Sequence, residues 1–477
     1  MIDRQEIMDF AREFQLDPSI IEKDYVLGWL LAGISNYPQL ESTWVFKGGT
    51  CLKKCYFETY RFSEDLDFTI TNPDHINPEF LNLVFSEISQ WIYDESGIEI
   101  PVERLRFDIY KNPQGRTSVE GRIYYQGPLQ RRGSLPRLKI DITHDEILVL
   151  NPIARRIHHP YSDMQDNGFS IQCYCFEEVF AEKLRALAER LRPRDLYDVV
   201  HLHRLDILGV DLKLLVRTLE DKCRFKSIAV PTMFILENKP EKAELVTEWE
   251  NMLGHQLPML PPFEQFWEEL PGLFEWLYSL VPKVVHKPIP APVEVDTKWK
   301  PPSMAHAWHT AVPLEAIRFA AANRLCVNLH YQGTRRLIEP YSLRRTKDGD
   351  ILLHAVKHNT GESRSYRIDR IQGAETTKIS FKPRYTIELI PSGPIFTSPT
   401  SRKSKSPAKY KTISYKSTRS RKSGSRRISG QPAYIIQCTI CGKKFNRTKY
   451  KTQLNPHKNK EGYPCPSRIG YIVDIKY

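Results

Sequence analysis

The chain has no long hydrophobic run: no apolar stretch reaches the roughly 18 residues that a membrane-spanning helix needs. Its first residues, MIDRQEIMDFAREF, mix acids into an amphipathic pattern and lack the basic flank and apolar core of a signal peptide. Cysteine is scarce, with nine in 477 residues, and an odd number without an export signal argues against a disulfide framework. We therefore expect a cytoplasmic protein without membrane contact, whose cysteines are free or bind a metal.

Acidic residues are scarce in the last part of the chain. Residues 301–477 carry 34 Lys and Arg against 10 Asp and Glu, whereas residues 1–300 carry 35 against 47. A part this basic usually binds nucleic acid, because Lys and Arg gain affinity by displacing the counterions condensed on phosphates. We therefore expect the two parts to differ in function, with nucleic acid as the partner of the basic one.

Proline and charge mark the domain boundaries. Residues 282–303 are rich in proline and show neither a helical nor a strand period, as in a semi-rigid linker. Residues 401–430 contain 11 Lys and Arg and no acid, so they cannot bury enough apolar surface to fold. The sequence thus predicts an acidic domain over 1–281, a linker over 282–303, a mixed domain over 304–390, a disordered basic linker over 391–432 and a small module over 433–477.

The segment FKGGTCLKKCYFE, residues 46–58, predicts the end of a strand, a tight turn at GGT and a short helix. Such a turn offers free backbone N–H groups and the Thr50 hydroxyl to a phosphate. A glycine pair alone is weak evidence for a phosphate site.

Two acids lie on the strand predicted over DLDFTI, residues 65–70. Leu66, Phe68 and Ile70 alternate with Asp65, Asp67 and Thr69, so one face is buried and the other presents both carboxylates. Carboxylates two residues apart on a strand lie about 6.6 Å apart at the Cα, close enough to bind divalent metals. The alternative is an exposed strand face, but the glycine turn just upstream favours a nucleotide site.

Asp141 is the candidate third metal ligand, because PRLKIDITHD predicts a strand with Asp141 on its polar face. It could also be an ordinary exposed strand acid.

Lys183 lies at the edge of the apolar stripe of a helix, where its ammonium could reach either water or nucleotide phosphates. Asp195 and Asp198 share a face of the next helix, and either could be an acid that favours a helix start.

Five segments in order resemble the AbiEii/AbiGii toxin family of nucleotidyltransferases: IEKDYVL (21–27), FKGGTCLKK (46–54), RFSEDLDF (61–68), AEKLRAL (181–187) and RPRDLYDV (192–199). The resemblance covers roughly residues 10–210. It implies an α/β (α+β) domain with the polymerase β-like fold, a mixed sheet with flanking helices, and Mg²⁺-dependent use of a nucleoside triphosphate. It also implies a toxin or phage-defence effector with an antitoxin partner. Some members of the family add nucleotides to tRNA 3′ ends.

The resemblance assigns site residues at matching positions. Gly49 and Thr50 would bind phosphate, Asp65 and Asp67 the Mg²⁺ ions, and Lys183 the triphosphate. Asp195 or Asp198 would match the late acidic position of the family. The expected nucleotide-binding set also includes Lys47, Gly48 and Ser63.

Alternating segments and turn residues over 325–371 predict the strands of a small barrel. RRLIEPYSL, DGDILLHAV and RSYRIDRI resemble a WYL domain, which has an Sm-like barrel fold and senses a ligand or binds nucleic acid. The Trp-Tyr-Leu of the family is Ile351-Leu352-Leu353 here. Five arginines could form a phosphate-binding cluster or a solvated basic face: Arg335, Arg336, Arg364, Arg367 and Arg370.

The last module contains four potential metal ligands, Cys438, Cys441, His457 and Cys465. Three thiols and an imidazole suit a closed tetrahedral Zn²⁺ site of the structural kind. About 45 basic residues cannot build a stable core alone, so zinc would supply folding energy. The other cysteine pairs, such as Cys51 with Cys55, lack a matching second pair and are expected to be buried free thiols.

The sequence therefore predicts a nucleotidyltransferase in which an acceptor hydroxyl of RNA or protein attacks the α-phosphate of a triphosphate held with Mg²⁺. The alternative is a nucleic-acid-binding regulator whose first domain only binds nucleotide.

Overall fold

The computed structural model describes residues 1–111, 117–131, 133–164, 168–204, 210–279, 286–299, 301 and 314–389, and in the C-terminal part 433–438, 441, 443–447, 454–459, 464–465 and 470–476. The chain divides into two compact units, Met1–Ser406 and Pro407–Tyr477. Among the helices of these described segments, none combines the length and apolarity needed to cross a membrane.

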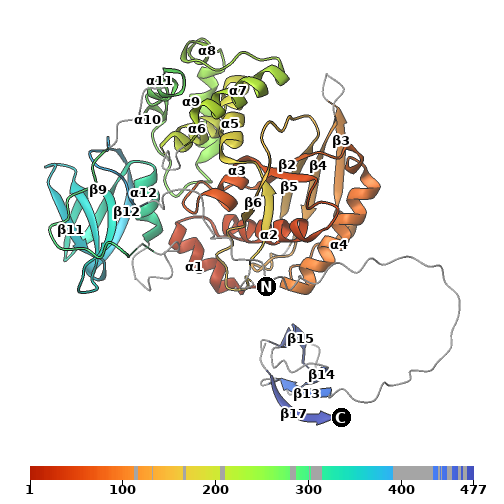
Figure 1. The fold of residues 1–477 in the computed structure, drawn as a ribbon. Coiled ribbons are helices and arrows are strands. Elements are labelled where there is room, and N and C mark those ends of the chain that lie inside the picture. The colour runs from red at the N-terminus through yellow and green to blue at the C-terminus, as the bar shows by residue number, and fades with distance from the viewer. Residues whose placement is uncertain are drawn as a thin grey trace. The chain divides into compact units, whose positions relative to one another are not determined.

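A mixed seven-stranded sheet organises the first part of the chain (Figure 1). Its strands are β1 (Trp44–Lys47), β2 (Asp65–Ile70), β3 (Arg106–Lys111), β4 (Thr117–Tyr124), β5 (Arg137–Thr143), β6 (Ile153–Arg156) and β7 (Ser170–Cys173). They lie in the order β3-β4-β5-β2-β1-β7-β6. The pairs β2–β5 and β1–β7 are parallel and the remaining pairs antiparallel. The predicted mixed sheet is confirmed.

The alternation in the sequence sets the two faces of the central strands. In β5, Leu138, Ile140 and Ile142 are buried, whereas the residues between them are partly exposed. In β2, Leu66 and Phe68 are likewise fully buried. A strand with one apolar and one polar face buries the first against helices and presents the second for function.

Helices flank this sheet and extend beyond it: α1 (Arg4–Phe14), α2 (Pro18–Asn36), α3 (Gly48–Cys51), α4 (Pro78–Ser96), α5 (Phe176–Arg190), α6 (Pro193–Arg204), α7 (Leu212–Lys226), α8 (Met233–Glu237), α9 (Lys242–Leu253), α10 (Phe263–Trp267) and α11 (Leu270–Ser279). A π-helical turn, Leu52–Tyr56, continues α3. Figure 1 shows α2 and α4 along the sheet and α5 to α9 as a separate group. Local signals set the ends: Asn77 caps α4 by accepting from two backbone N–H groups, and Gly97 ends it at φ +79°.

A second, antiparallel sheet follows in the order β11-β10-β9-β8-β12. Its elements are α12 (Leu314–Ala322), β8 (Leu325–Tyr331), β9 (Thr334–Arg345), β10 (Ile351–Lys357), β11 (Ser363–Arg367) and β12 (Ile371–Ser380). The predicted strands and turns are present, but the sheet is open rather than a closed barrel, because pairing among the described strands ends at β11 and β12. Ile289, from within the predicted linker, is buried in the core of this sheet beside Tyr341 and Val356.

The C-terminal unit contains short strands around a small core. They are β13 (Ala433–Cys438), β14 (Lys444–Arg447), β15 (His457–Lys458), β16 (Pro464–Cys465) and β17 (Gly470–Lys476). Three of them form a sheet in the order β14-β13-β17, and β15 pairs with β16. The predicted disordered linker, 391–432, lies outside the described residues.

Candidate active site

Four charged residues form a row across the first sheet. Glu120 of β4 pairs with Asp141 of β5, Asp141 with Asp67 of β2, and Asp67 with Lys47 of β1. Paired residues on neighbouring strands share a face of the sheet. Asp65 lies two residues before Asp67 and shares that face as well. The structure therefore brings the three predicted metal-binding acids together.

The electrostatics of these acids favour a bound cation. Burial, and then the charge of Asp67, raise the pKa of Asp65 above its usual range. Burial raises the pKa of Asp141 to about 6, with the acids of β2 adding to the effect and Lys139 opposing it. The Lys139 ammonium lies 2.9 Å from Asp141 Oδ2, while Oδ1 is buried without a hydrogen-bond partner among the described residues. Crowded carboxylates with a spare buried oxygen fit Mg²⁺, which takes oxygen ligands.

The glycine turn packs directly against these acids. Gly48 adopts φ +79°, and a Cβ there would lie 2.2 Å from Asp67 Oδ2, so conformation and space both require glycine. A Cβ on Gly49 would meet the Arg61 guanidinium at 2.6 Å and Ser63 Oγ at 3.2 Å. The predicted phosphate-binding residues of the turn thus lie together beside β2. The Thr50 hydroxyl donates to the backbone carbonyl of Asp65, which ties the turn to the first metal-binding acid.

Lys183 of α5 is held by Asp198 of α6, with 2.8 Å between Nζ and Oδ2. Asp198 is fully buried and also accepts from Arg61 Nε and Nη2 and from the Tyr60 hydroxyl, at 2.6 to 2.7 Å. Burial alone would raise the pKa of Asp198, but Arg61 and Lys183 bring it well below its usual range. Asp198 therefore orients two cations of the site, and its role in nucleotide binding stays a prediction.

Two other predicted nucleotide-binding residues have ion-pair partners of their own. Asp195 is fully buried and accepts from Arg190 Nε and Nη2 at 2.7 and 2.8 Å. The Lys47 ammonium lies 3.3 Å from Glu182 Oε1. Burial alone would raise the pKa of Glu182, but Lys47 and Lys222 lower it well below its usual range. The roles of Asp195 and Lys47 in nucleotide binding stay predictions.

The sequence patterns did not predict that Arg61, Tyr60 and Glu182 contact residues of the site. Arg61 and Glu182 lie inside RFSEDLDF and AEKLRAL, and Tyr60 directly precedes the first of these. The signal for Arg61 was its position between two aromatic residues, which predicts burial and hence a carboxylate partner. Arg194 was also missed: it is partly buried, its Nε donates to the Met252 carbonyl, and Asp65 is among the charges that act on it.

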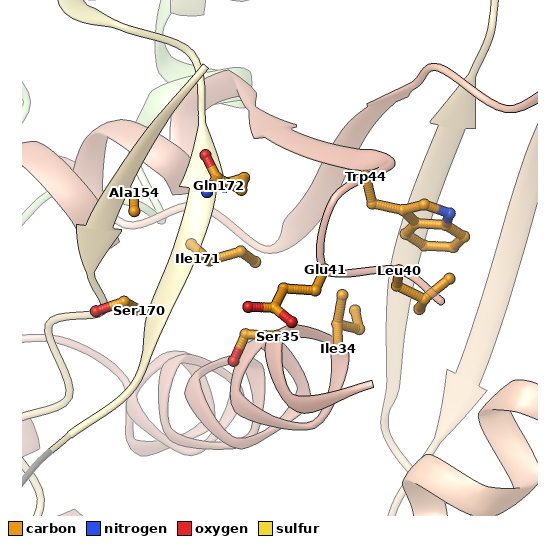
Figure 2. A pocket seen from close by; sticks show the side chains of 9 residues that line it. All are labelled: Ile34, Ser35, Leu40, Glu41, Trp44, Ala154, Ser170, Ile171 and Gln172. Carbon is orange, nitrogen blue, oxygen red and sulfur yellow. The ribbon is translucent and has the colours of Figure 1, made fainter. Parts of the chain in front are cut away.

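A small cavity of about 70 Å³ lies at the other end of β1 (Figure 2). Trp44 begins the strand there, whereas Lys47 and the glycine turn follow its last residue. Ile34 and Ser35 of α2 and Ile171 of β7 contribute to its lining. The cavity is therefore separate from the acidic row.

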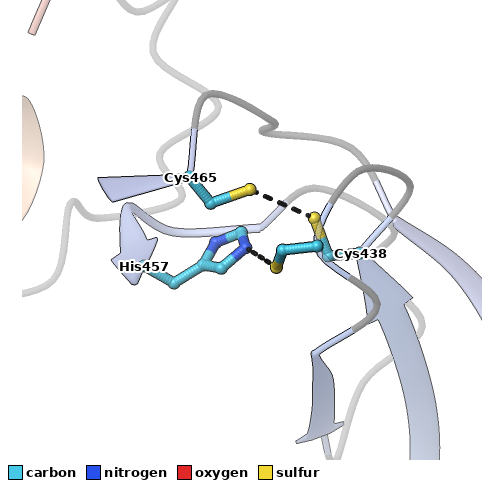
Figure 3. A group of neighbouring side chains, drawn as sticks. Cys438, His457 and Cys465 are labelled. Atoms are coloured by element: carbon cyan, nitrogen blue, oxygen red, sulfur yellow. Dashed lines mark hydrogen bonds between the residues drawn. The ribbon is translucent and has the colours of Figure 1, made fainter. Parts of the chain in front are cut away.

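The four predicted zinc ligands lie together in the C-terminal unit, and Figure 3 shows three of them labelled. Their ligand atoms all lie within 4.8 Å of one another. Cys438 Sγ is 3.6 Å from Cys465 Sγ, and Cys441 Sγ is 3.2 Å from His457 Nε2. His457 Nδ1 lies 3.0 Å from the Asn455 carbonyl, so it is the protonated nitrogen and leaves Nε2 for a metal. This donor set fits tetrahedral Zn²⁺.

Cys51, Cys55 and Cys173 form a second group with sulfur atoms within 4.8 Å of one another. The sequence predicted buried free thiols at Cys51 and Cys55, and both are fully buried. It missed that Cys173 joins them, because β7 is brought beside β1 by a long-range parallel pairing.

The five arginines of the second sheet are partly neutralised. Arg364 pairs with Glu362, and Arg367 with Asp350 and Asp369. Arg336 lies over two rings, 5.4 Å from the Tyr331 centroid and 5.8 Å from that of Tyr366. Arg335 and Arg370 are exposed. A phosphate-binding role for this face stays a prediction.

Acids on adjacent strands of a mixed sheet, beside a glycine turn and a buried lysine, define a site of the nucleotidyltransferase class. Residues 29–269 match the family model described as nucleotidyl transferase AbiEii toxin, type IV TA system. This match spans just over half of the 477 residues. The chain belongs to this family of nucleotidyltransferases, and residues 313–376 match the WYL domain. Both predicted resemblances are confirmed.

Comparison with solved structures gave weaker likenesses. MenT4, nucleotidyltransferase toxin Rv2826c from Mycobacterium tuberculosis H37Rv, is 18% identical, with a TM-score of 0.39, over 59% of this chain and 91% of that one. Proteasome accessory factor B/C (PafBC) of Arthrobacter aurescens is 15% identical, with a TM-score of 0.14, over 58% of this chain and 62% of that one. At these scores neither likeness carries an argument. A search of curated proteins found no match.

Proposed function

We propose that the chain transfers a nucleotide from a nucleoside triphosphate to a hydroxyl of RNA, with the 3′ end of tRNA as the acceptor that the family resemblance favours. The observation that carries this proposal is the convergence of Asp65, Asp67 and Asp141 beside the glycine turn. RNA is preferred to a protein acceptor because residues 301–477 carry 34 Lys and Arg against 10 acids.

Different residues of the site would have different roles in nucleotide transfer. Asp65, Asp67 and Asp141 would hold Mg²⁺, which when bound offsets the charge that develops on the phosphates. The N–H groups of the glycine turn bind phosphate oxygens, and Lys183, oriented by Asp198, neutralises the triphosphate. The acceptor oxygen bonds to the α-phosphorus as its hydroxyl proton passes to water, and the bond from the α-phosphorus to the bridging oxygen breaks to release pyrophosphate. The chain's own contribution is therefore position and charge.

Partners follow from the same features. The basic C-terminal part would capture the RNA, with Arg335 and Arg336 among the contacts. A toxin of this family calls for an antitoxin protein that restrains it. We place the activity in the cytoplasm, where triphosphates and tRNA are abundant.

A bound zinc ion would stabilise the fold of the C-terminal unit. The four donors Cys438, Cys441, His457 and Cys465 leave no coordination position open, so the ion would have a structural role. Among the described residues of this unit, Ile436 and Leu454 join Cys438 and Cys465 in a small buried cluster. A bound metal would therefore supply much of its folding free energy.

Incubation of the full chain with each labelled nucleoside triphosphate, Mg²⁺ and total RNA tests the proposal. We expect label from one or a few nucleotides to appear at the ends of RNA. Label on protein instead would redirect the proposal to a protein acceptor. Nucleotide binding without any transfer would favour the alternative, a nucleic-acid-binding regulator that only senses nucleotide.

A further inference from the structure

Helix α12, which precedes the second sheet, is buried on every side. All nine of its residues are at most 7% exposed, including the charged Glu315 and Arg318. A helix with no exposed face must have a neighbour on each side. On one side it meets its own sheet, where Thr376 Oγ1 donates to the Ala316 carbonyl at 3.1 Å.

The other side of α12 meets the nucleotidyltransferase domain. Thr59 Oγ1 donates to Glu315 Oε2 at 3.2 Å, while Glu315 Oε1 accepts from Arg318 at 2.8 Å. Just after the helix, Gln265 Nε2 donates to the Asn323 carbonyl at 2.9 Å. Glu269 joins the two domains further, because it pairs with Arg204 at the end of α6 and with Arg324 before β8.

Thr59 is adjacent to the residues that orient the site. The next residue, Tyr60, and the one after it, Arg61, both hold Asp198, which in turn holds Lys183. Arg61 also lies against the glycine turn at Gly49. All three residues of this segment are at most 5% exposed. Thr59 is therefore within two residues of contacts with both predicted phosphate-binding parts of the site.

We infer that Glu315 is a positioning residue for nucleotide binding, acting through the segment 59–61, and that the WYL domain thereby controls the affinity of the nucleotidyltransferase site. The inference rests on the proposed function. Its physical basis is a hydrogen bond between a buried acid of one domain and a segment that fixes Arg61 in the other. Coupling is reciprocal, so nucleotide binding must also stabilise α12.

The test compares a variant that loses the Thr59 hydroxyl with one that keeps it. Thr59→Val removes the donor to Glu315 and keeps the shape, whereas Thr59→Ser keeps the donor. We expect Thr59→Val to weaken binding of Mg²⁺–triphosphate by about 5-fold or more, a typical coupling, and Thr59→Ser to bind like the wild type. Hydrogen exchange of residues 314–322 should slow on nucleotide binding in the wild type and Thr59→Ser, and not in Thr59→Val. Melting temperatures establish that both variants fold.

Equal nucleotide affinity in the two variants, with unchanged exchange in α12, would overturn the inference. If Thr59→Val does not fold, Glu315→Ala tests the bond from the other side, and Glu362→Ala, which changes an exposed acid just before β11, is its control. The readouts need nucleotide binding alone, so they still decide the inference if the wild type binds nucleotide but transfers none. A wild type that neither binds nor transfers nucleotide would overturn the proposed function and the inference with it.

Discussion

Asp67 and Asp141 occupy paired positions on the parallel strands β2 and β5, although a long stretch of sequence separates them. The pairing matters because a shift of one residue would turn one of the two carboxylates to the opposite face. Lys47 and Glu120 extend the row on either side. The register of three strand pairs therefore builds the acidic centre of the candidate active site.

Replacing Asp67 by Asn should abolish nucleotide transfer while the protein stays folded. The carboxylate lies on the polar face of β2, so its loss removes a metal ligand and not core packing. Transfer from a labelled triphosphate and the melting temperature are the measurements. Asp108→Asn is the matched control, because Asp108 is a largely exposed acid on strand β3 of the same sheet. Unchanged transfer by the Asp67 variant would remove this residue from the site.

Asp198→Ala should destabilise the first domain strongly, by about 3–5 kcal/mol, because it leaves the charges of Arg61 and Lys183 buried without their carboxylate partner. Lys183→Met should cost less stability, since Asp198 keeps Arg61, yet it should abolish transfer. Urea unfolding and transfer assays on both variants separate the two effects. Equal losses of stability would mean that Arg61 does not hold Asp198 as described.

The contact between the domains should respond to pH through Glu13 of α1. Burial, and then the charge of Glu315, raise the pKa of Glu13 to about 7, against the opposing effect of Arg318. A carboxyl whose pKa is raised by folding adds stability below its usual pKa of 4.5, and that stability is lost as pH rises through about 7. Glu13→Gln should therefore raise the melting temperature relative to the wild type, by a margin that grows from about pH 5 to pH 8.

The control for this experiment is Asp9→Asn, which changes an exposed acid on the same helix. Its margin over the wild type, measured across the same pH range, is the baseline. A margin for Glu13→Gln that does not grow relative to this baseline would show that Glu13 titrates like an exposed carboxyl.

The purified chain should contain about one zinc ion, as a closed four-ligand site requires. Cys465→Ser should lose the metal and unfold the C-terminal unit while the nucleotidyltransferase domain melts as before, because the two are separate compact units. Cys175→Ser, which changes a thiol outside both cysteine groups, should keep the metal. Metal analysis that finds no zinc in the wild type would contradict the proposal.

RNA binding should weaken steeply with salt if the basic part captures the acceptor, because each neutralised phosphate releases counterions. Removing residues 391–477 takes away 20 Lys and Arg against two acids. The shortened chain should therefore show lower RNA affinity and a shallower dependence on salt. Titration of both chains at several salt concentrations measures this, and identical slopes would exclude residues 391–477 as the RNA platform.

Much of the acidic centre could be predicted because it depends on local patterns. Alternation in residues 65–70 and 137–143 placed three acids on polar strand faces, and the GGT turn marked the end of β1. The mixed sheet followed from the family resemblance. In these places a short-range pattern in the chain corresponds directly to a face or a turn.

The roles of Asp195 and Asp198 could not be separated in the sequence. They lie three residues apart on one helix, yet one pairs with Arg190 and the other with Arg61. Those partners depend on how α5, α6 and the segment before β2 come together, which no local pattern encodes. The open second sheet was missed for a similar reason, since closure depends on whether the first and last strands meet.

The most direct test of the account follows label from an α-labelled triphosphate into RNA, with the wild type and Asp67→Asn side by side. The account predicts that the wild type transfers label to RNA ends and releases pyrophosphate in equal amount, and that Asp67→Asn does neither. Label that enters RNA equally with both proteins, or never enters it with the wild type under any of the four nucleotides, would contradict it.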